Sequence, residues 1–352
     1  MIFELMAIIR EMDMNINTVN LKTIIRGLKN PRILVIGDLA LDEMVYGDTE
    51  RISREAPVLI LQHTYTKYIL GGASNAANNV STINDSKVGV IGVVGNDYQA
   101  QDLKNAFVSA GINCEGIVID DTRKTTTKTR ISGACSQSVT QQIVRIDRQT
   151  NVPISEETEN KIIKNIKNAV PNYNAVILSD YHIGTITDKI IKTVTDLAEQ
   201  YSIKVIVDAQ KELNRYKNIY SMTPNLPDTQ RHLGFFIKTK EDFIKAGNIL
   251  IEQTGAENIL ITCGDDGMVL IEKNGKYTHI PVFNKSRVFD VTGAGDTVTA
   301  IYALGLASGA NAVDAAIIGN IAAGIVIRQF GCATTTITEI LSDTPDKINI
   351  EY

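Results

Sequence analysis

The residues best suited to chemistry lie at positions 289–297, where the sequence reads Phe-Asp-Val-Thr-Gly-Ala-Gly-Asp-Thr. A helical pattern follows over residues 298–307. Small residues at 293–295 let backbone N–H groups point together at a helix N-terminus, which is a preformed site for a phosphate. Asp296 would lie in the first turn, where its carboxylate can accept a proton from a hydroxyl that attacks a phosphoryl group. The alternative is that the glycines only form a turn and Asp296 only caps the helix.

Short β-branched runs alternate with longer helical patterns, which predicts βαβ units and a mainly parallel sheet. Buried parallel strands read as continuous apolar runs. Such runs occupy residues 33–36, 88–91, 175–178, 205–207 and 259–261. Polar or glycine-containing turns follow them, at the ends where a doubly wound sheet binds its ligands. We therefore expect an α/β fold, a doubly wound mainly parallel sheet with helices on both faces, which ends in apolar helices at about 294–308 and 311–328.

Two segments, about 44–70 and 125–147, alternate Thr, Val, Ile, Tyr and Gln as half-exposed antiparallel strands do. They predict a small β-lid inserted into the fold. Neither an internal repeat nor a low-complexity linker is visible, so one domain over 31–342 is favoured over two independent domains. Residues 1–30 are expected to form an N-terminal extension or a helix packed outside the core, and 343–352 a C-terminal tail.

Composition narrows the class of protein. The 352 residues carry a net charge of −5, which disfavours nucleic-acid binding through bulk positive charge. The longest apolar stretch, 315–327, is interrupted by Asn320 and is too short to cross a bilayer, so no membrane partner is expected. The cysteines have no metal-site spacing and are interpreted as reduced thiols of a cytoplasmic protein. They are Cys114, Cys135, Cys263 and Cys332.

A second glycine motif, Gly71-Gly72-Ala73-Ser74-Asn75, precedes the D-x-x-G-A-G-D stretch at 290–296 in the other half of the chain. The ordered pair resembles the two signatures of the ribokinase-like (PfkB) sugar kinases, and the resemblance covers about residues 31–340. It implies a ribokinase-like fold and ATP-dependent phosphorylation of a sugar, a small-molecule substrate. The sequence contains no G-x-x-x-x-G-K-[ST] motif, so a P-loop mechanism is disfavoured.

Five blocks resemble, more finely, the branch of this family that phosphorylates heptose 7-phosphate on the way to ADP-heptose. The resemblance implies the anomeric hydroxyl as acceptor and a 1,7-bisphosphate as product, made by the kinase half of a bifunctional enzyme or its stand-alone form. The blocks are residues 37–42, 51–58, 142–147, 178–181 and 223–226. Three positions depart from the pattern: Ile183 and Gln210 replace lysines, and Asp228 replaces a glutamate. Another sugar or sugar phosphate (fructose 1-phosphate, ribose or a nucleoside), or a catalytically weak sugar-binding relative, therefore remains an alternative.

The same resemblance assigns expected roles to individual residues. Asp296 is the base, with Gly293, Ala294 and Gly295 as the anion hole. Expected sugar ligands are Asp38, Asp42, Gly71, Gly72, Asn75, Arg145 and Asp180. Expected ATP contacts are Asn225, Thr262, Gly264, Gly267 and Asn320, although a plain hairpin turn would also explain residues 262–267.

Metal ions and charge partners are expected as well. Mg²⁺ would be held mostly by ATP and water, with Asp228 acting through water, and Asp290 with Thr292 could form a monovalent-cation (K⁺) site. One of four basic side chains is expected to bind a substrate phosphate, and the choice among them is open. They are Arg145, Arg51, Lys128 and Arg130. The resemblance also makes a homodimer through the lid plausible.

Overall fold

A nine-stranded sheet forms the body of the protein in a computed structural model that describes residues 14–15, 18–134, 140–283 and 288–350. Its strand order is β14-β13-β12-β11-β10-β9-β2-β5-β6. Neighbours from β12 to β6 pair in parallel, and β13 and β14 add an antiparallel edge. The strands are β2 (Ile33–Gly37), β5 (Val88–Val94), β6 (Asn113–Ile119), β9 (Ala175–Asp180), β10 (Lys204–Ala209), β11 (Ser221–Met222), β12 (Asn258–Thr262), β13 (Met268–Glu272) and β14 (Tyr277–Ile280).

The five apolar runs are all strands of this sheet, so the α/β fold class is confirmed. Alternate residues of each strand pack on opposite faces. In β2, Ile33 and Val35 belong to one buried cluster, and Leu34 and Ile36 belong to the other. The first cluster includes side chains of α3 (Ala73–Asn84), α4 (Tyr98–Ser109), α9 (Ala294–Ala307) and α10 (Ala312–Val326). The second includes α5 (Glu156–Ala169), α6 (Asp188–Tyr201) and α8 (Lys240–Thr254).

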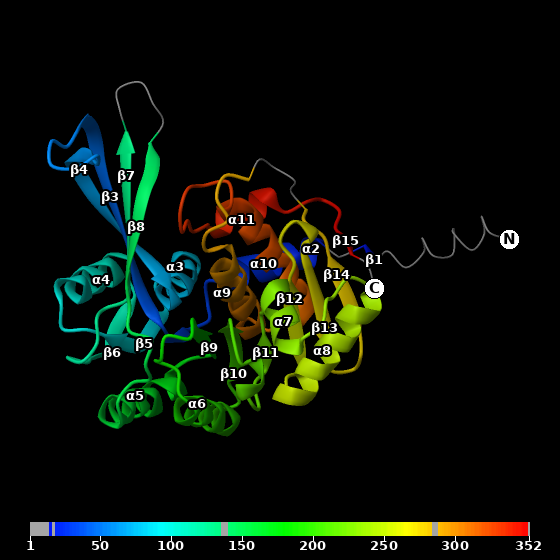
Figure 1. Ribbon diagram of the computed structural model, residues 1–352. Coiled ribbons are helices and arrows are strands. Elements are labelled where there is room, and N and C mark those ends of the chain that lie inside the picture. Colours follow the sequence, from blue (N-terminus) through cyan, green and yellow to red (C-terminus); the bar gives the residue numbers. More distant parts are fainter. Residues whose placement is uncertain (1–13, 16–17, 135–139, 284–287, 351–352) are drawn as a thin grey trace.

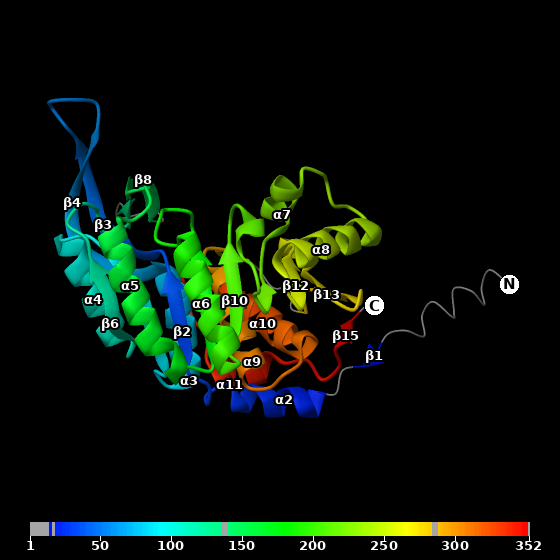
Figure 2. The ribbon, with the colours of Figure 1, turned by 90° about the horizontal axis from the view of Figure 1, so that it is seen from below.

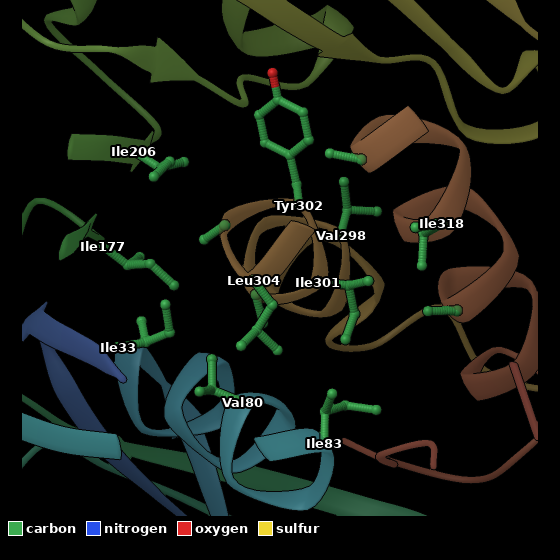
Figure 3. Packing of buried hydrophobic residues seen from close by; sticks show 14 of the residues in the cluster. Ile33, Val80, Ile83, Ile177, Ile206, Val298, Ile301, Tyr302, Leu304 and Ile318 are labelled. Atoms are coloured by element: carbon green, nitrogen blue, oxygen red, sulfur yellow. The ribbon is translucent and has the colours of Figure 1, made fainter. Parts of the chain in front are cut away.

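Helix α9 is enclosed on all sides. Its side chains meet Ile33, Ile177 and Ile206 of the sheet, Val80 of α3 and Ile318 of α10 (Figure 3). Every residue from 296 to 306 is buried, which explains why the helix is apolar around its whole circumference. This packing fixes the position of the helix N-terminus, where the Gly-Ala-Gly-Asp stretch lies.

The N-terminal region packs differently from the expectation. Helix α2 (Thr18–Gly27) lies against α11 (Ile337–Asp343) at the foot of the body (Figure 2). Leu21 and Ile25 are fully buried in the main core, so the expectation of a helix outside the core was wrong. Strand β1 (Met14–Asn15) pairs with β15 (Asn349–Ile350), which ties the two ends of the chain together.

The lid is a separate four-stranded sheet that stands out from the body (Figure 1). It consists of β3 (Leu39–Ile52), β4 (Leu59–Gly72), β7 (Thr127–Ala134) and β8 (Gln141–Arg148), in the order β4-β3-β7-β8. The expectation of antiparallel strands was correct for two pairings, but β3 and β7 run parallel. Both strands leave the carboxyl-end edge of the main sheet, after β2 and β6, and so point the same way. Within the described ranges, no helix has the length and apolar character needed to cross a membrane.

Candidate active site

The N-terminus of α9 has the geometry of an anion site. Gly293 is its N-cap with φ of 80°, a left-handed conformation that favours glycine. The first amide groups of a helix have no acceptor within it, so the amides after Gly293 can serve a ligand. A Cβ at Gly293 would lie 2.5 Å from Nδ2 of Asn75. Gly293 is thus required both by the turn and by the close approach of α3.

A cavity of about 440 Å³ opens beside this helix end. Thr262, Gly264 and Gly267, which connect β12 to β13, form part of its wall, so the segment is both a hairpin turn and a cavity lining. Asn320 also lines it and donates hydrogen bonds to the carbonyls of Ile280 and Pro281. Apolar side chains complete the wall, namely Val282, Val288, Val291, Val298, Ala323 and Ile327. An apolar wall beside a helix N-terminus suits a nucleotide, whose base is flat and whose phosphates are anionic.

A second cavity of about 420 Å³ lies between the lid and the loops around residues 290 and 331. Asp42 of β3 lines it and pairs with Arg130 of β7, with 3.0 Å between Oδ1 and Nη1. Gly71 leaves room for that carboxylate, because a Cβ there would lie 3.1 Å from Cγ of Asp42. Cys332 also lines this cavity, with its Sγ 3.8 Å from Oδ2 of Asp42.

Asp296 lies next to lining residues of both cavities. It directly follows Gly295 of the first cavity and interacts electrostatically with Asp42 of the second. Its side chain is 6% exposed. Asn75 Nδ2 donates to Oδ2 at 2.8 Å, and the Tyr181 hydroxyl donates to Oδ1 at 2.7 Å. Both donors are neutral, and burial raises the pKa of this carboxyl.

A buried hydrogen-bond chain links Asp296 to the first glycine motif. The Thr297 hydroxyl donates to Oδ1 of Asn79 at 3.0 Å, and Nδ2 of Asn79 donates to Oδ1 of Asn75 at 3.2 Å. Asn75 then donates to Asp296. Sequence reasoning found Asn75 and missed Asn79 and Tyr181. The signal for Asn79 was present, since a polar residue four positions after Asn75 lies on the same helix face.

Two of the expected sugar ligands, Asp38 and Asp180, accept hydrogen bonds from the backbone of residues 181–185. Asp38, 1% exposed, accepts hydrogen bonds from the backbone amides of Tyr181, Ile183 and Thr185. Burial and the nearby Asp180 raise the pKa of Asp38 to about 6.

Asp180 accepts hydrogen bonds from the Tyr216 hydroxyl and the His182 amide. Neither Asp38 nor Asp180 is among the residues that line the two cavities, and a sugar contact for them stays a prediction. Gly72 caps α3 with φ of 55°, and a Cβ there would lie 2.9 Å from the Asp38 carbonyl oxygen.

The four basic side chains that are candidates for binding a substrate phosphate differ in their contacts. Arg145 forms two hydrogen bonds with Asp147, at 2.8 and 2.7 Å, on the exposed side of the lid. Arg130 is paired with Asp42, and Arg51 lies near the end of β3. Lys128 is half-buried, with Nζ 5.5 Å from the centroid of the Tyr181 ring. Within the described ranges, no salt bridge involves Lys128.

Oxygen ligands for a divalent metal are sparse. Among the described residues, no three His, Cys, Asp or Glu side chains converge to hold an ion. Asn225 caps α7 (Leu226–Leu233) and bonds both the amide and the carboxylate of Asp228, each at 2.7 Å. Burial, Asp296 and Asp228 raise the pKa of Asp208, which the sequence analysis did not select, to about 8. Asp208 and Asp228 therefore suit an ion held mainly by nucleotide oxygens and water.

The expected monovalent-cation residues form a tight turn. Oδ1 of Asp290 accepts hydrogen bonds from the amide and the hydroxyl of Thr292, at 2.9 and 2.7 Å. Oδ2 of Asp290 accepts one from the amide of Gly331 at 2.9 Å. The hydrogen bond from Gly331 joins the segment before α9 to the loop that carries Cys332. A cation at Asp290 and Thr292 stays a prediction.

Replacing Gly293 by alanine should destabilise the protein by about 1–3 kcal/mol, because the left-handed backbone and the contact with Asn75 both disfavour a Cβ. The free energy of unfolding from urea denaturation measures this. Gly295→Ala is the matched control, since a Cβ at Gly295 meets nothing within 4 Å and its backbone is helical. Equal stability of the two variants would contradict the proposed need for glycine at 293.

Comparisons with known proteins identify the family of the chain. Residues 30–339 match the model of the pfkB family carbohydrate kinases. The bifunctional protein HldE of Pelobacter propionicus is 37% identical over 92% of this chain and 65% of its own length. The HldE of Aliarcobacter butzleri is 38% identical over 89% of this chain and 64% of its own length, so the chain spans less than two thirds of these relatives.

Solved structures of low sequence identity share the fold. Arabidopsis thaliana ribokinase complexed with ribose and ATP superposes with a TM-score of 0.66 at 17% identity, over 89% of this chain and 98% of that one. Escherichia coli phosphofructokinase-2 in complex with potassium gives a TM-score of 0.69 at 14% identity, over 89% and 97%. With the family match across most of its length, the chain belongs to the pfkB family of carbohydrate kinases, which are phosphotransferases with an alcohol acceptor.

Proposed function

We propose that this kinase transfers the γ-phosphoryl group of ATP to the anomeric hydroxyl of D-glycero-D-manno-heptose 7-phosphate, giving the 1,7-bisphosphate. The observation that carries the proposal is the position of Asp296. It directly follows Gly295 of a nucleotide-sized cavity, and it interacts electrostatically with Asp42 of a second cavity that Arg130 also lines. The finer choice of sugar is supported by the heptose-kinase-like blocks and by the 36–38% identity to proteins named HldE.

In this proposal, the adenosine of ATP lies along the apolar wall of the first cavity, and its phosphates reach the amides that follow Gly293. These amides stabilise the charge that develops on the transferring group. Mg²⁺ bound to the nucleotide would supply further positive charge, with Asp228 and Asp208 as the candidate contacts through water. Asp296 accepts the proton of the attacking hydroxyl, which requires the carboxylate to be ionised.

The second cavity favours an acceptor that is already phosphorylated. Arg130 lines it, and Lys128 lies on the same lid strand. A guanidinium and an ammonium group suit a phosphate better than they suit an uncharged pentose or nucleoside. Asp42 lies on the same wall and can accept hydrogen bonds from vicinal hydroxyls of the sugar. A different sugar phosphate is the second candidate, favoured by the departures at Ile183, Gln210 and Asp228.

We also propose a homodimer that forms through the lid, and a cytoplasmic location. Support for the dimer comes from apolar side chains that the lid exposes, namely Ile52, Val58, Leu59, Tyr65, Ile143, Val144 and Ile146. An exposed apolar surface of this kind is typical of a protein interface. The location is supported by the free thiols of Cys114, Cys263 and Cys332. Cys135 lies outside the described residues.

Asp296→Asn should lower turnover by about 10²–10⁴-fold, because an amide cannot accept the proton. The affinity for ATP, measured by calorimetry, should stay nearly unchanged. Asp314→Asn is the matched control, since Asp314 is another buried acid in a helix first turn, at the far end of the α9–α10 pair. Unchanged turnover in Asp296→Asn would contradict the role of this carboxylate as the base.

A panel of acceptors distinguishes the candidate substrates. We expect heptose 7-phosphate to give ADP release with kcat/KM at least about tenfold above fructose 1-phosphate, ribose and adenosine, since each 1.4 kcal/mol of specific binding is a factor of ten. A coupled ADP assay with Mg²⁺ measures the rates, with and without K⁺. Preference for another acceptor would contradict the heptose assignment and leave the kinase assignment intact. Binding without ADP release would favour the weakly catalytic sugar-binding relative.

Val144→Asp should convert the dimer to a monomer, because the charge would be buried in the lid interface. Sedimentation velocity of the purified chain measures the mass, which we expect to be twice that of one chain for the unaltered protein. Phe236→Asp is the control, since Phe236 is 77% exposed but lies outside the lid. An unaltered protein that sediments as a monomer at micromolar concentration would contradict the dimer.

A further inference from the structure

We propose that Tyr181 is a positioning residue, which orients the carboxylate of Asp296 and keeps it ionised, and that Lys128 of the lid holds the Tyr181 ring in place. The inference rests on the proposed function, in which Asp296 accepts a proton from the acceptor. It concerns a side chain that the signature motifs of the sequence do not contain.

The hydrogen bonds around Asp296 leave each of its carboxylate oxygens able to accept one more hydrogen bond. Tyr181 donates to Oδ1 and Asn75 donates to Oδ2, so each oxygen has one neutral donor. Each carboxylate oxygen can accept a second hydrogen bond. The two donors therefore fix the rotation of the carboxylate about its Cβ–Cγ bond and still allow an acceptor hydroxyl to approach. With the Tyr181 hydroxyl removed, Asn75 alone would restrain that rotation.

Three separate elements hold the Tyr181 side chain. Its backbone amide donates to Oδ2 of Asp38 at 2.8 Å, in the loop after β9. A Cβ at Gly72, the cap of α3, would lie 3.6 Å from Cε2 of the ring, so the start of α3 lies beside the phenol. Lys128 of β7 lies over the ring at 5.5 Å, within the range of a cation–π interaction. The phenol is thus placed by the body and by the lid together.

Tyr181 is one of several groups that shift the pKa of Asp296. Burial raises the pKa of Asp296, and Asp42 of β3 raises it further. The hydrogen bonds from Asn75 and Tyr181, and the charge of Lys128, lower it. Cys332 and Asp208 of β10 are the other titratable groups that interact with the Tyr181–Asp296 pair. Burial and the carboxylate of Asp296 raise the pKa of Tyr181 well above 10, so the phenol stays protonated and donates throughout the neutral range.

The direction of the pH effect follows from these contacts. The base acts when it is ionised, so activity is present above the pKa of Asp296 and is lost as the pH falls through it. A hydrogen bond donated to a carboxylate stabilises the ionised form. Removal of the Tyr181 hydroxyl therefore raises this pKa, and the acidic limb of the pH profile moves to higher pH.

Tyr181→Phe tests the inference, because it removes the hydroxyl and keeps the ring that packs against Gly72 and Lys128. We expect the midpoint of the acidic limb of kcat/KM to rise by about one pH unit, and kcat on the plateau to fall about tenfold, as expected for a lost hydrogen bond to a charged group. The KM for ATP should stay within about twofold. Lys128→Met should shift the limb in the same direction, since it removes the cation and keeps the apolar stem.

Tyr302→Phe is the matched control. Tyr302 is a buried tyrosine of α9, and its hydroxyl donates to Asn258 and not to a carboxylate. If loss of a buried hydroxyl disturbed the site only through the packing of α9, this variant would also shift the acidic limb. We expect Tyr302→Phe to lower the free energy of unfolding and to leave the acidic limb where it is. An acidic limb in Tyr181→Phe that coincides with that of the unaltered protein would overturn the inference.

A second measurement does not depend on turnover. The ¹³C carboxyl resonance of Asp296, assigned by its absence in Asp296→Asn, can be titrated in the unaltered protein and in Tyr181→Phe. We expect the higher pKa in the variant, even if no acceptor of the panel is phosphorylated. If the pKa rises but no sugar is phosphorylated, the proposed function fails while the contact stands. If the pKa does not rise in a folded variant, the positioning role is wrong, whatever the substrate.

Discussion

The site depends on the complete burial of helix α9. Because side chains of the sheet, of α3 and of α10 surround it, the helix cannot rotate or slide without opening the core. Its N-terminal amides and the carboxylate of Asp296 are therefore held at one place, between two cavities of similar size. Preorganised dipoles of this kind stabilise a transition state with little rearrangement during the reaction. The protein thus uses a helix buried from Asp296 to Leu306 to place the groups that act on the substrate.

A second constraint is the burial of several carboxyl groups around that helix end. Asp38 and Asp180 accept hydrogen bonds from the backbone of the loop that carries Tyr181. Burial and the charge of Asp296 raise the pKa of Asp208. Such a group is stable in its charged form only when donors or cations face it. The lid strand β7 brings the basic side chains of Lys128 and Arg130 to this region. The position of the lid therefore affects the charge of the site.

The fold class was predictable from the sequence because a buried parallel strand has a clear signature, and all five apolar runs are strands. Strand β11 was not predictable, since it contains two residues and pairs only within the finished sheet. The parallel pairing of β3 with β7 follows from where both strands leave the body, which local alternation does not encode. In the site, spacing identified Gly293, Asn75 and Asp296. It missed Tyr181 and Asn79, because their roles arise from contacts between distant segments.

A crystal structure of the chain with ADP and an acceptor sugar phosphate tests the central claim most directly. The account predicts that the β-phosphate of ADP lies at the amides following Gly293, in the cavity that Thr262 and Asn320 line. It also predicts that the hydroxyl to be phosphorylated lies within hydrogen-bond distance, about 2.6–3.2 Å, of the Asp296 carboxylate. A nucleotide bound elsewhere, or an acceptor hydroxyl out of reach of that carboxylate, would contradict it.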